Sequence, residues 1–366
     1  MTIEPMVLTS PPELYGEDRD AASTSVTLSP AAPQSDDIVA LVGEIEEEFP
    51  RTLRRRMASR GDCGDVPVTC IDRGSGCGVN SQSLIDAFVR VVRRLTPLSA
   101  MAFCNEKFPG CFSPLAATIQ SKGRGEPFAY RAMLCGSFLD QLVPDATVDL
   151  VTSNAALHWL DLNRLPPRGE TPRMTRGGID RELARIASTQ WQRLLDSVAT
   201  ELRPGGKLVA SFLARSDGHE RHLPLALLDR AIKEVVGDAF ERSDTLLACP
   251  IPIYPRSRAE IVAPFQRPSK SPPLVLDRCR VEAIECPYYR QFLRSGDAAG
   301  YANSFTEFIR AFSSTRLTEW LANWFSADDC HRVANAIYDS IRDRIGREPA
   351  SYRMRKHRAI IVATKT

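Results

Sequence analysis

The 366-residue chain contains no apolar run of about 20 residues, the length that a helix needs to cross a bilayer. Its first residues have neither the basic start nor the apolar core of a secretory signal peptide. Lysine and arginine almost balance aspartate and glutamate, and a net charge of only +2 gives no electrostatic reason to expect a nucleic-acid partner. The one dense basic run, residues 54–56, is interpreted as solvated surface. These absences predict a cytoplasmic protein without a membrane or a nucleic acid as partner.

The ten cysteines form no C-x-x-C pair. Cys63, Cys70 and Cys77 are seven residues apart, which is not a zinc-ligand spacing. In a chain of this size the cysteines therefore indicate reduced thiols. His219 and His222 stand three residues apart in a charged segment without a further ligand nearby, so that no metal is expected.

Strands and helices are expected to alternate after an N-terminal arm. Residues 1–36 are rich in Ser, Pro, Thr and Asp, which predicts a flexible arm, and Asp36 or Asp37 is a candidate cap for a helix over residues 37–56. The alternation predicts the α/β class, with a mainly parallel sheet and helices on both faces. The expected strands are residues 66–71, 100–104, 129–134, 148–152, 207–213, 274–285 and 358–364, and the other expected helices are residues 81–95, 180–202, 223–236 and about 303–325.

The segment IDRGSGCGVN, residues 71–80, is the most informative in the chain. Asp72 follows an apolar stretch and precedes glycines at three alternate positions, which let a backbone turn tightly and approach a ligand closely. A strand, a glycine-rich turn and a helix in this order hold nucleotide-type ligands in open α/β sheets. The dinucleotide spacing G-x-G-x-x-G is not matched, whereas an acid just ahead of the glycines is typical of proteins that bind S-adenosylmethionine. For this motif alone, a tight turn without a ligand remains an alternative.

Further motifs follow in order along the chain. Asp72, Gly74, Gly78 and Asn80 form D-x-G-x-x-x-G-x-N, and three later segments are NEKFPGCF (105–112), GSF (136–138) and SNAALHWL (153–160). In this order the motifs resemble those of the SABATH family, the S-adenosylmethionine-dependent carboxyl methyltransferases of small molecules, over about residues 66–365.

The resemblance implies a Rossmann-like class I methyltransferase sheet with helices on both faces and an α-helical cap. It also implies that the arm closes over the site as a lid. The implied division is an arm over residues 1–36 and a methyltransferase domain over 37–366, with its core sheet in about 60–215 and 274–366 and cap elements in about 160–180, 216–273 and 300–345.

The cofactor-binding residues that the resemblance implies lie at the ends of expected strands. Glu106 is placed to bind the ribose hydroxyls of S-adenosylmethionine, and Ser137 and Phe138 to contact its adenine. The full implied set is Asp72, Gly74, Asn80, Glu106, Ser137 and Phe138.

Trp159 and His158 are the implied substrate-binding residues. In the family the indole N–H of the matching tryptophan donates to the substrate carboxylate, and a buried carboxylate needs such donors. His158 is expected to support the loop. No catalytic residue is expected, because a carboxylate is already ionised at neutral pH and needs no base.

Several departures from the family pattern leave the substrate open. Arg73 stands where a small apolar residue is preferred, Ala155 replaces an aromatic residue, and Ser29 and Gln34 only loosely match the pattern of the family's N-terminal lid. Phe308 and its aromatic neighbours in residues 303–325 suit either a wall for a small apolar acid or an ordinary core. The alternatives are methylation of a hydroxyl or nitrogen on a small metabolite, and a non-catalytic scaffold. A homodimer is also possible.

Overall fold

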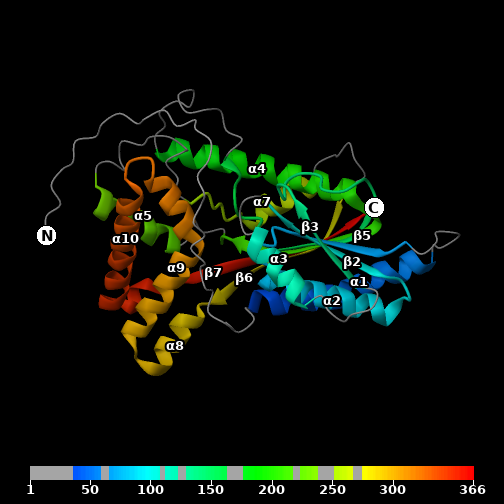
Figure 1. Ribbon diagram of the computed structural model, residues 1–366, viewed down its shortest axis with the longest axis horizontal. Coiled ribbons are helices and arrows are strands. Elements are labelled where there is room, and N and C mark those ends of the chain that lie inside the picture. The colour runs from blue at the N-terminus through cyan, green and yellow to red at the C-terminus, as the bar shows by residue number, and fades with distance from the viewer. Residues whose placement is uncertain are drawn as a thin grey trace.

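In the computed structural model, seven strands form one mixed sheet in the order β3-β2-β1-β4-β5-β7-β6 (Figure 1). Strands β1 to β5 are parallel, and β7 is antiparallel to both of its neighbours, as expected for a mainly parallel sheet. The strands are β1 (Val68–Arg73), β2 (Ala100–Glu106), β3 (Ala129–Cys135), β4 (Val148–Asn154), β5 (Leu202–Ala214), β6 (Leu274–Glu285) and β7 (Arg355–Lys365). All seven predicted strands are present. Six agree with the prediction to within three residues at each end, whereas β5 begins five residues earlier than expected.

The structure describes residues 36–58, 66–107, 112–122, 129–162, 176–216, 223–237, 251–266 and 274–366. The predicted arm up to residue 35, with Ser29 and Gln34, lies outside these ranges, as do His219 and His222. No helix in the described part of the chain combines the length and the apolar character required to cross a membrane.

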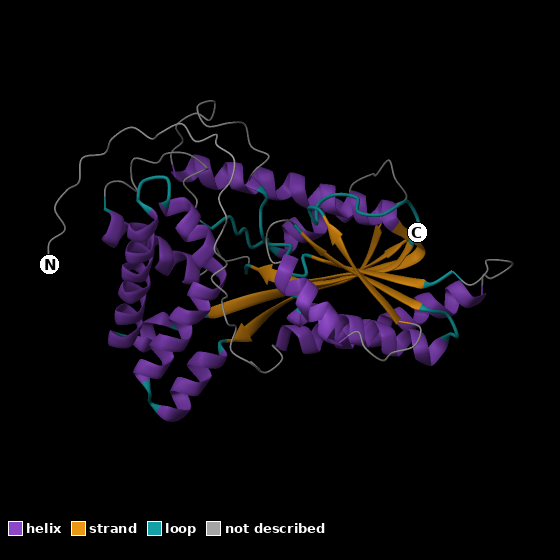
Figure 2. Ribbon diagram, in the orientation of Figure 1, coloured by secondary structure: helices purple, strands orange, loops and turns teal. Residues whose placement is uncertain are grey.

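Helices cover both faces of the sheet (Figure 2). On one face, α1 (Asp36–Ala58), α2 (Val79–Leu95) and α3 (Phe112–Lys122) share one hydrophobic core with the sheet. Helix α1 packs against β4 and β5, α2 against β1 and β2, and α3 against β3. On the other face, α4 (Arg176–Glu201) packs with the short helix α7 (Arg258–Val262). The predicted α/β architecture is confirmed.

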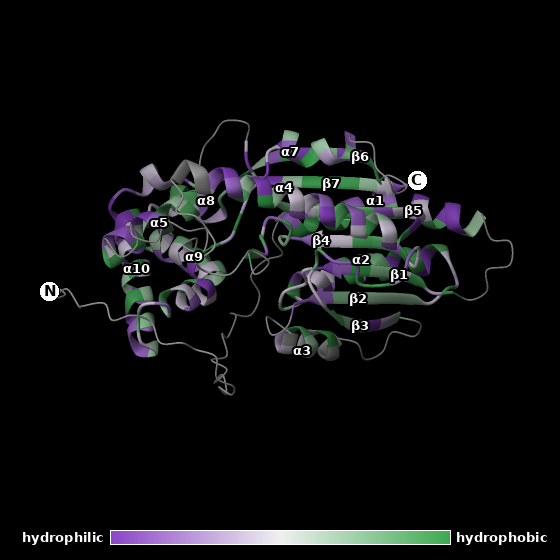
Figure 3. Ribbon diagram, turned by 90° about the horizontal axis from the view of Figure 1, so that it is seen from above, coloured by the Kyte–Doolittle hydropathy of each residue, from purple (hydrophilic) through white to green (hydrophobic). Residues whose placement is uncertain are grey.

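Four helices form a cap with a hydrophobic core of its own. They are α5 (Leu223–Val236), α8 (Pro287–Ser295), α9 (Ala298–Leu321) and α10 (Ala327–Arg347). Seen from above, the cap lies at one end of the sheet (Figure 3). The bounds differ from the sequence-based division, because the buried Ile261 holds α7 to the sheet, whereas the buried Tyr289 brings α8 into the cap.

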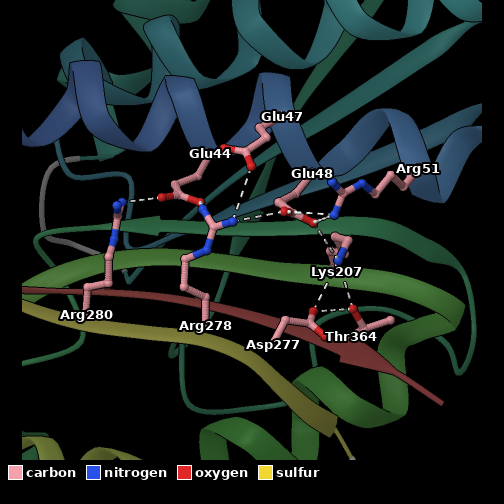
Figure 4. Close-up of polar contacts among 9 residues, drawn as sticks. All are labelled: Glu44, Glu47, Glu48, Arg51, Lys207, Asp277, Arg278, Arg280 and Thr364. Atoms are coloured by element: carbon pink, nitrogen blue, oxygen red, sulfur yellow. Dashed lines mark hydrogen bonds and ion pairs between the residues drawn. The ribbon is translucent and has the colours of Figure 1, made fainter.

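Ion pairs fasten helix α1 to the strands beneath it (Figure 4). Glu44 and Glu48 are buried on α1; Glu44 pairs with Arg278 and Arg280 of β6, and Glu48 lies 3.4 Å from Lys207 of β5. The buried carboxylates require such partners, since an unpaired charge is costly to remove from water. These contacts fix the position of α1 along the sheet.

The first residues of α1 lie at the carboxyl end of the parallel strands. Asp37, one of the two residues expected to cap this helix, instead pairs with Lys356 and Arg358 at the start of β7. Because β7 runs antiparallel to β5, its first residues lie beside the last residues of β5. The N-terminal end of α1 is thereby held at the edge of the sheet where α/β folds place their ligands.

The arginine run at the other end of α1 is only partly solvated. Arg54 and Arg55 are exposed, as expected. Arg56 is half-buried, pairs with Asp149 of β4 and donates a 2.9 Å hydrogen bond to the carbonyl of Val66. The expectation of a wholly solvated run is therefore wrong, because the buried Asp149 requires donors.

Candidate active site

Two glycines of the turn between β1 and α2 meet different surroundings. Gly74 has φ +72°, and a Cβ there would lie 2.4 Å from the Cβ of Ala156, in the loop after β4. Gly76 has φ +55°, but a Cβ there would meet no atom within 4 Å. Gly74 therefore permits close packing inside the protein, whereas Gly76 leaves an open space in which a ligand can approach the backbone.

The carboxylate of Asp72 accepts hydrogen bonds from the turn, from α2 and from β4. Its side chain is buried, and one carboxylate oxygen accepts from the hydroxyls of Ser75, at 3.0 Å, and of Ser81. The other oxygen accepts from the Thr152 hydroxyl of β4 at 2.8 Å. Burial raises the pKa of the Asp72 carboxyl, and the three hydroxyl donors oppose that shift. The residue thus joins β1, β4 and the first turn of α2; its direct contact with a cofactor stays a prediction.

The raised pKa of Asp72 gives the stability a pH dependence. Because its pKa in the folded state exceeds the ordinary value of 3.8, the folded state binds this proton more tightly than the unfolded state. The group's contribution is therefore most favourable below about pH 4 and declines as the pH rises through the folded-state pKa. We expect Asp72→Asn, which cannot ionise, to lack this decline. Urea unfolding should show that the free energy of unfolding of the variant, relative to that of the wild type, is higher at pH 7 than at pH 4. The same difference at both pH values would contradict this.

Glu106, at the end of β2, lies beside the open side of the turn. One of its carboxylate oxygens accepts from the Gly76 N–H at 2.7 Å, and the other from the Lys107 N–H at 3.1 Å. These bonds orient a half-buried carboxylate whose remaining lone pairs are available to a ligand. Glu106 is therefore positioned where the sequence predicted an acid for ribose hydroxyls.

The other predicted cofactor residues surround the same turn. Ser137 and Phe138 follow β3, and the ring of Phe138 lies 3.8 Å from the position of a Cβ on Gly74. Asn80 is exposed in the first turn of α2. The fold thus gathers the predicted residues at the carboxyl ends of β1, β2 and β3.

A buried ion pair that was not predicted from the sequence holds the loop after β3. Arg73 and Glu201 are paired with side chains only 1% and 0% exposed. Arg73 donates to the carbonyls of Phe138, at 2.6 Å, and of Asp140, at 3.1 Å, while Glu201 accepts from the Leu142 N–H. The arginine that departs from the family pattern therefore has a structural role, which is to fix the loop that carries Phe138.

A cavity of about 190 Å³ lies between the ends of β4 and β5 and the cap. Its apolar wall includes Trp159, Ile253 and two rings of α9, Phe308 and Phe312. The aromatic residues predicted in α9 therefore have two different locations. Phe305 lies in the cap core, whereas Phe308 and Phe312 also line the cavity. This shape and lining suit a small, largely apolar ligand.

The loop after β4 brings His158 and Trp159 to the cavity. Trp159 forms an isolated antiparallel bridge with Ile253, and His158 Nδ1 accepts from the Leu213 N–H at 3.3 Å. The buried Arg256 supports this loop by donating to the carbonyl of Leu157 at 2.6 Å. Both predicted substrate residues therefore line the cavity, whereas the anchoring role of Arg256 was not predicted from the sequence.

No protein-family model matches the chain. Among curated proteins, it is 28% identical over 205 residues to the methyltransferase LUC1 of Fusarium, over 53% of this chain and 54% of the relative. It is 27% identical over 190 residues to the rice indole-3-acetate O-methyltransferase 1, over 42% and 46% of the two chains. It is also 23% identical over 236 residues to the Arabidopsis thaliana gibberellic acid methyltransferase 2, over 55% and 60% of the two chains.

The chain is a divergent relative of the SABATH-type methyltransferases. It spans about half the length of the curated relatives that it matches.

A solved structure shares its fold with nearly the whole chain. A solved loganic acid methyltransferase with SAH superimposes with a TM-score of 0.68 and 15% identity, covering 91% of this chain and 95% of the other. The predicted Rossmann-like fold is thus confirmed, whereas the resemblance to the SABATH family is supported by the curated relatives.

Proposed function

We propose that this chain is an S-adenosylmethionine-dependent O-methyltransferase that esterifies the carboxylate of a small, aromatic or apolar acid. The observation that carries the proposal is the cavity lined by Trp159, whose loop also contacts the glycine turn through Ala156 and Gly74. An acceptor site and a cofactor site would thereby adjoin each other. The names of two curated relatives and of the superimposed structure refer to acids, namely indole-3-acetate, gibberellic acid and loganic acid, which supports a carboxylate acceptor.

The residues around the turn fit S-adenosylmethionine. The open space at Gly76 and the half-buried carboxylate of Glu106 lie side by side, joined by the 2.7 Å hydrogen bond. We assign the ribose hydroxyls to Glu106 and the adenine to Ser137 and Phe138. Asp72, Gly74 and Asn80 complete the proposed cofactor set. The bound cofactor would supply a methyl group already activated by its sulfonium sulfur.

In this proposal the protein positions the acceptor and excludes water. A carboxylate is ionised at neutral pH, and it therefore needs no proton removed before it accepts a methyl group. The indole N–H of Trp159 would hold the carboxylate, and the rings of Phe308 and Phe312 would keep water from the cavity. Correct orientation then accounts for much of the rate acceleration.

A hydroxyl or nitrogen acceptor would require a base, and His158 is the first residue to consider. Its Nδ1 already accepts the Leu213 N–H, an arrangement that suits support of the loop better than proton abstraction. A scaffold without activity would not require a cavity with a wall of aromatic rings. The carboxylate is therefore the acceptor that the site favours.

The segment before α1 is part of the proposal. Asp37, the second residue of α1, lines the cavity. We assign to this arm the covering of the bound acid. The cytoplasmic location and the homodimer stay predictions from the sequence.

The proposed function is tested with Trp159→Phe, which keeps an aromatic wall but loses the donor. Methyl-ester formation from a panel of small acids should fall about 10- to 100-fold in kcat/KM, because an unpaired buried carboxylate costs about 1–3 kcal/mol. Calorimetric affinity for S-adenosylmethionine should be unchanged. Trp324→Phe serves as the matched control, because Trp324 is partly buried against the cap core and does not line the cavity.

Two outcomes would contradict the proposal. If the wild type binds S-adenosylmethionine but forms no ester from any acid, the scaffold alternative is favoured. A rate that rises steeply between about pH 6 and 9 would indicate a hydroxyl, thiol or amine acceptor, since a carboxylate is ionised throughout that range.

A further inference from the structure

An ion pair joins the segments on either side of the glycine turn. Lys107 follows the last residue of β2, and Asp161 lies in the loop after β4. The Nζ of Lys107 lies 3.2 Å from one carboxylate oxygen of Asp161 and 3.4 Å from the other. Because β1 lies between β2 and β4, the pair links two strands that are about 10 Å apart, across the carboxyl end of β1. The glycine turn begins at this end of β1.

The two residues belong to the two sides of the proposed site. On the cofactor side, the Lys107 N–H donates to Glu106 at 3.1 Å, and the same carboxylate accepts from the Gly76 N–H at 2.7 Å. On the acceptor side, Asp161 is two residues beyond Trp159, which lines the cavity. The pair therefore connects the residue assigned to the ribose hydroxyls with the loop assigned to the acid.

Asp161 is held in place by its backbone. Its N–H donates to the side-chain oxygen of Gln190 on α4 at 3.0 Å, and its carbonyl accepts from the side-chain nitrogen of Gln190 at 2.8 Å. The preceding residue, Leu160, donates its N–H to the carbonyl of Pro252 at 2.7 Å. The Asp161 carboxylate is thus presented from a fixed backbone, and its side chain is only 10% exposed.

Lys107, by contrast, can leave the pair without disturbing the fold. Its side chain is 49% exposed, and a flexible four-carbon stem carries the ammonium group. An ion pair with an exposed partner contributes little to stability, because solvent competes for the charge. The contact can therefore open and close while the two strands keep their positions.

Methyl transfer makes two opposite demands on the carboxyl edge of the sheet. Water must be excluded while the methyl group moves, but the spent cofactor must leave after every turnover. The open space at Gly76 adjoins Glu106, and the side chain of Lys107 extends from the next residue to the loop after β4. A half-exposed ion pair at this point can close that space and release it again.

We propose that Lys107 and Asp161 form a latch that closes the proposed cofactor site and must open for S-adenosylmethionine to enter and SAH to leave. This inference rests on the proposed function, because it assigns the space beside Gly76 to the cofactor. Salt screens a half-exposed ion pair, so the latch is open for a larger fraction of the time at high ionic strength. Entry and departure of the cofactor then become faster together, because each requires the open form.

The test measures the association and dissociation rate constants of SAH by surface plasmon resonance on the immobilised protein. The two conditions are about 0.01 M and about 1 M NaCl, where the screening length is about 30 Å and about 3 Å. SAH is a suitable probe because its ammonium and carboxylate groups cancel in charge, so that salt has little effect on the free ligand. In the wild type both rate constants should be about two- to fivefold higher at high salt, the range expected for an exposed ion pair.

Two substitutions remove the latch. Lys107→Met keeps an unbranched side chain but loses the charge, and Asp161→Asn keeps the shape of the carboxylate but loses its charge. In each variant both rate constants at low salt should be about two- to fivefold above those of the wild type, and they should no longer respond to salt.

Two further variants serve as controls. Lys107→Arg retains the charge and should retain slow, salt-sensitive exchange. Glu46→Gln breaks another exposed ion pair, which joins α1 to Arg90 of α2 at 2.8 Å on a face of the sheet. Both rate constants should be unchanged in this variant, because the pair lies away from the carboxyl edge.

The two rate constants together distinguish a latch from a simple binding contact. If Lys107→Met raises only the dissociation rate constant, Lys107 contributes to affinity alone and the latch is overturned. Rate constants in Lys107→Met that equal those of the wild type at low salt would also overturn the inference. Both results leave the proposed cofactor site intact, whereas a wild type that does not bind SAH would overturn the cofactor site and the latch together.

Discussion

Glu201→Gln should lower the free energy of unfolding by about 3–5 kcal/mol, the usual cost of removing one partner from a buried ion pair. Glutamine has nearly the shape of glutamate, but it leaves the guanidinium of Arg73 without a countercharge and replaces one of the two accepting oxygens with an NH2 donor. Burial lowers the pKa of Arg73 because it disfavours the charged form, and the neighbouring Glu201 carboxylate opposes that shift. Denaturant unfolding followed by circular dichroism measures the effect.

The matched control is Glu47→Gln. Glu47 also pairs with an arginine, Arg278, at 3.2 Å, but its side chain is 55% exposed (Figure 4). Solvent screens such pairs, so we expect no measurable change in the unfolding midpoint. A double variant, Arg73→Met with Glu201→Met, should not recover the loss, because the carbonyls of Phe138 and Asp140 and the N–H of Leu142 would lose their hydrogen-bond partners. A Glu201→Gln protein as stable as the wild type would show that the charge at this position is not required.

Gly74→Ala should also be strongly destabilising, by about 2–5 kcal/mol. A left-handed conformation costs a residue with a Cβ about 1–2 kcal/mol, and overpacking adds about 1–3 kcal/mol. Here the new methyl group would lie 2.4 Å from the Cβ of Ala156. Because Ala156 belongs to the loop that carries Trp159, relief of this clash would displace the acceptor side of the site.

Gly76→Ala separates packing from ligand binding. It shares the left-handed backbone but places its methyl group in open space, so it should cost only about 1–2 kcal/mol of stability. The same methyl group would occupy the space proposed for the cofactor. The free energy of binding S-adenosylmethionine, measured by calorimetry, should therefore decrease by more than the free energy of unfolding. Equal destabilisation by both substitutions would contradict the assignment of Gly74 to packing, and full affinity in Gly76→Ala would move the cofactor away from this turn.

The sequence by itself determined the fold class and the approximate location of the site. Apolar strands, helical periodicity and a turn with alternate glycines are local properties, since they depend on residues close together in the chain. Their order predicted the parallel sheet, and parallel strands bring their carboxyl ends to one edge. Asp72, Glu106, Phe138 and Trp159, which the family resemblance implied as site residues, each lie near the end of a strand; their roles stay predictions.

Tertiary structure alone decided which partners the polar side chains have. Arg73 and Glu201 are 128 residues apart, and nothing near either residue in the sequence indicates the other. Asp37 was a candidate helix cap from its local sequence, but β7 places Lys356 and Arg358 beside it, and it pairs with them instead. Lys107 and Asp161 are 54 residues apart, and only the strand order β2-β1-β4 brings their side chains together. The physical reason is that burial and pairing depend on distances in space, and the free energy of a polar group is set by the neighbours that replace its water.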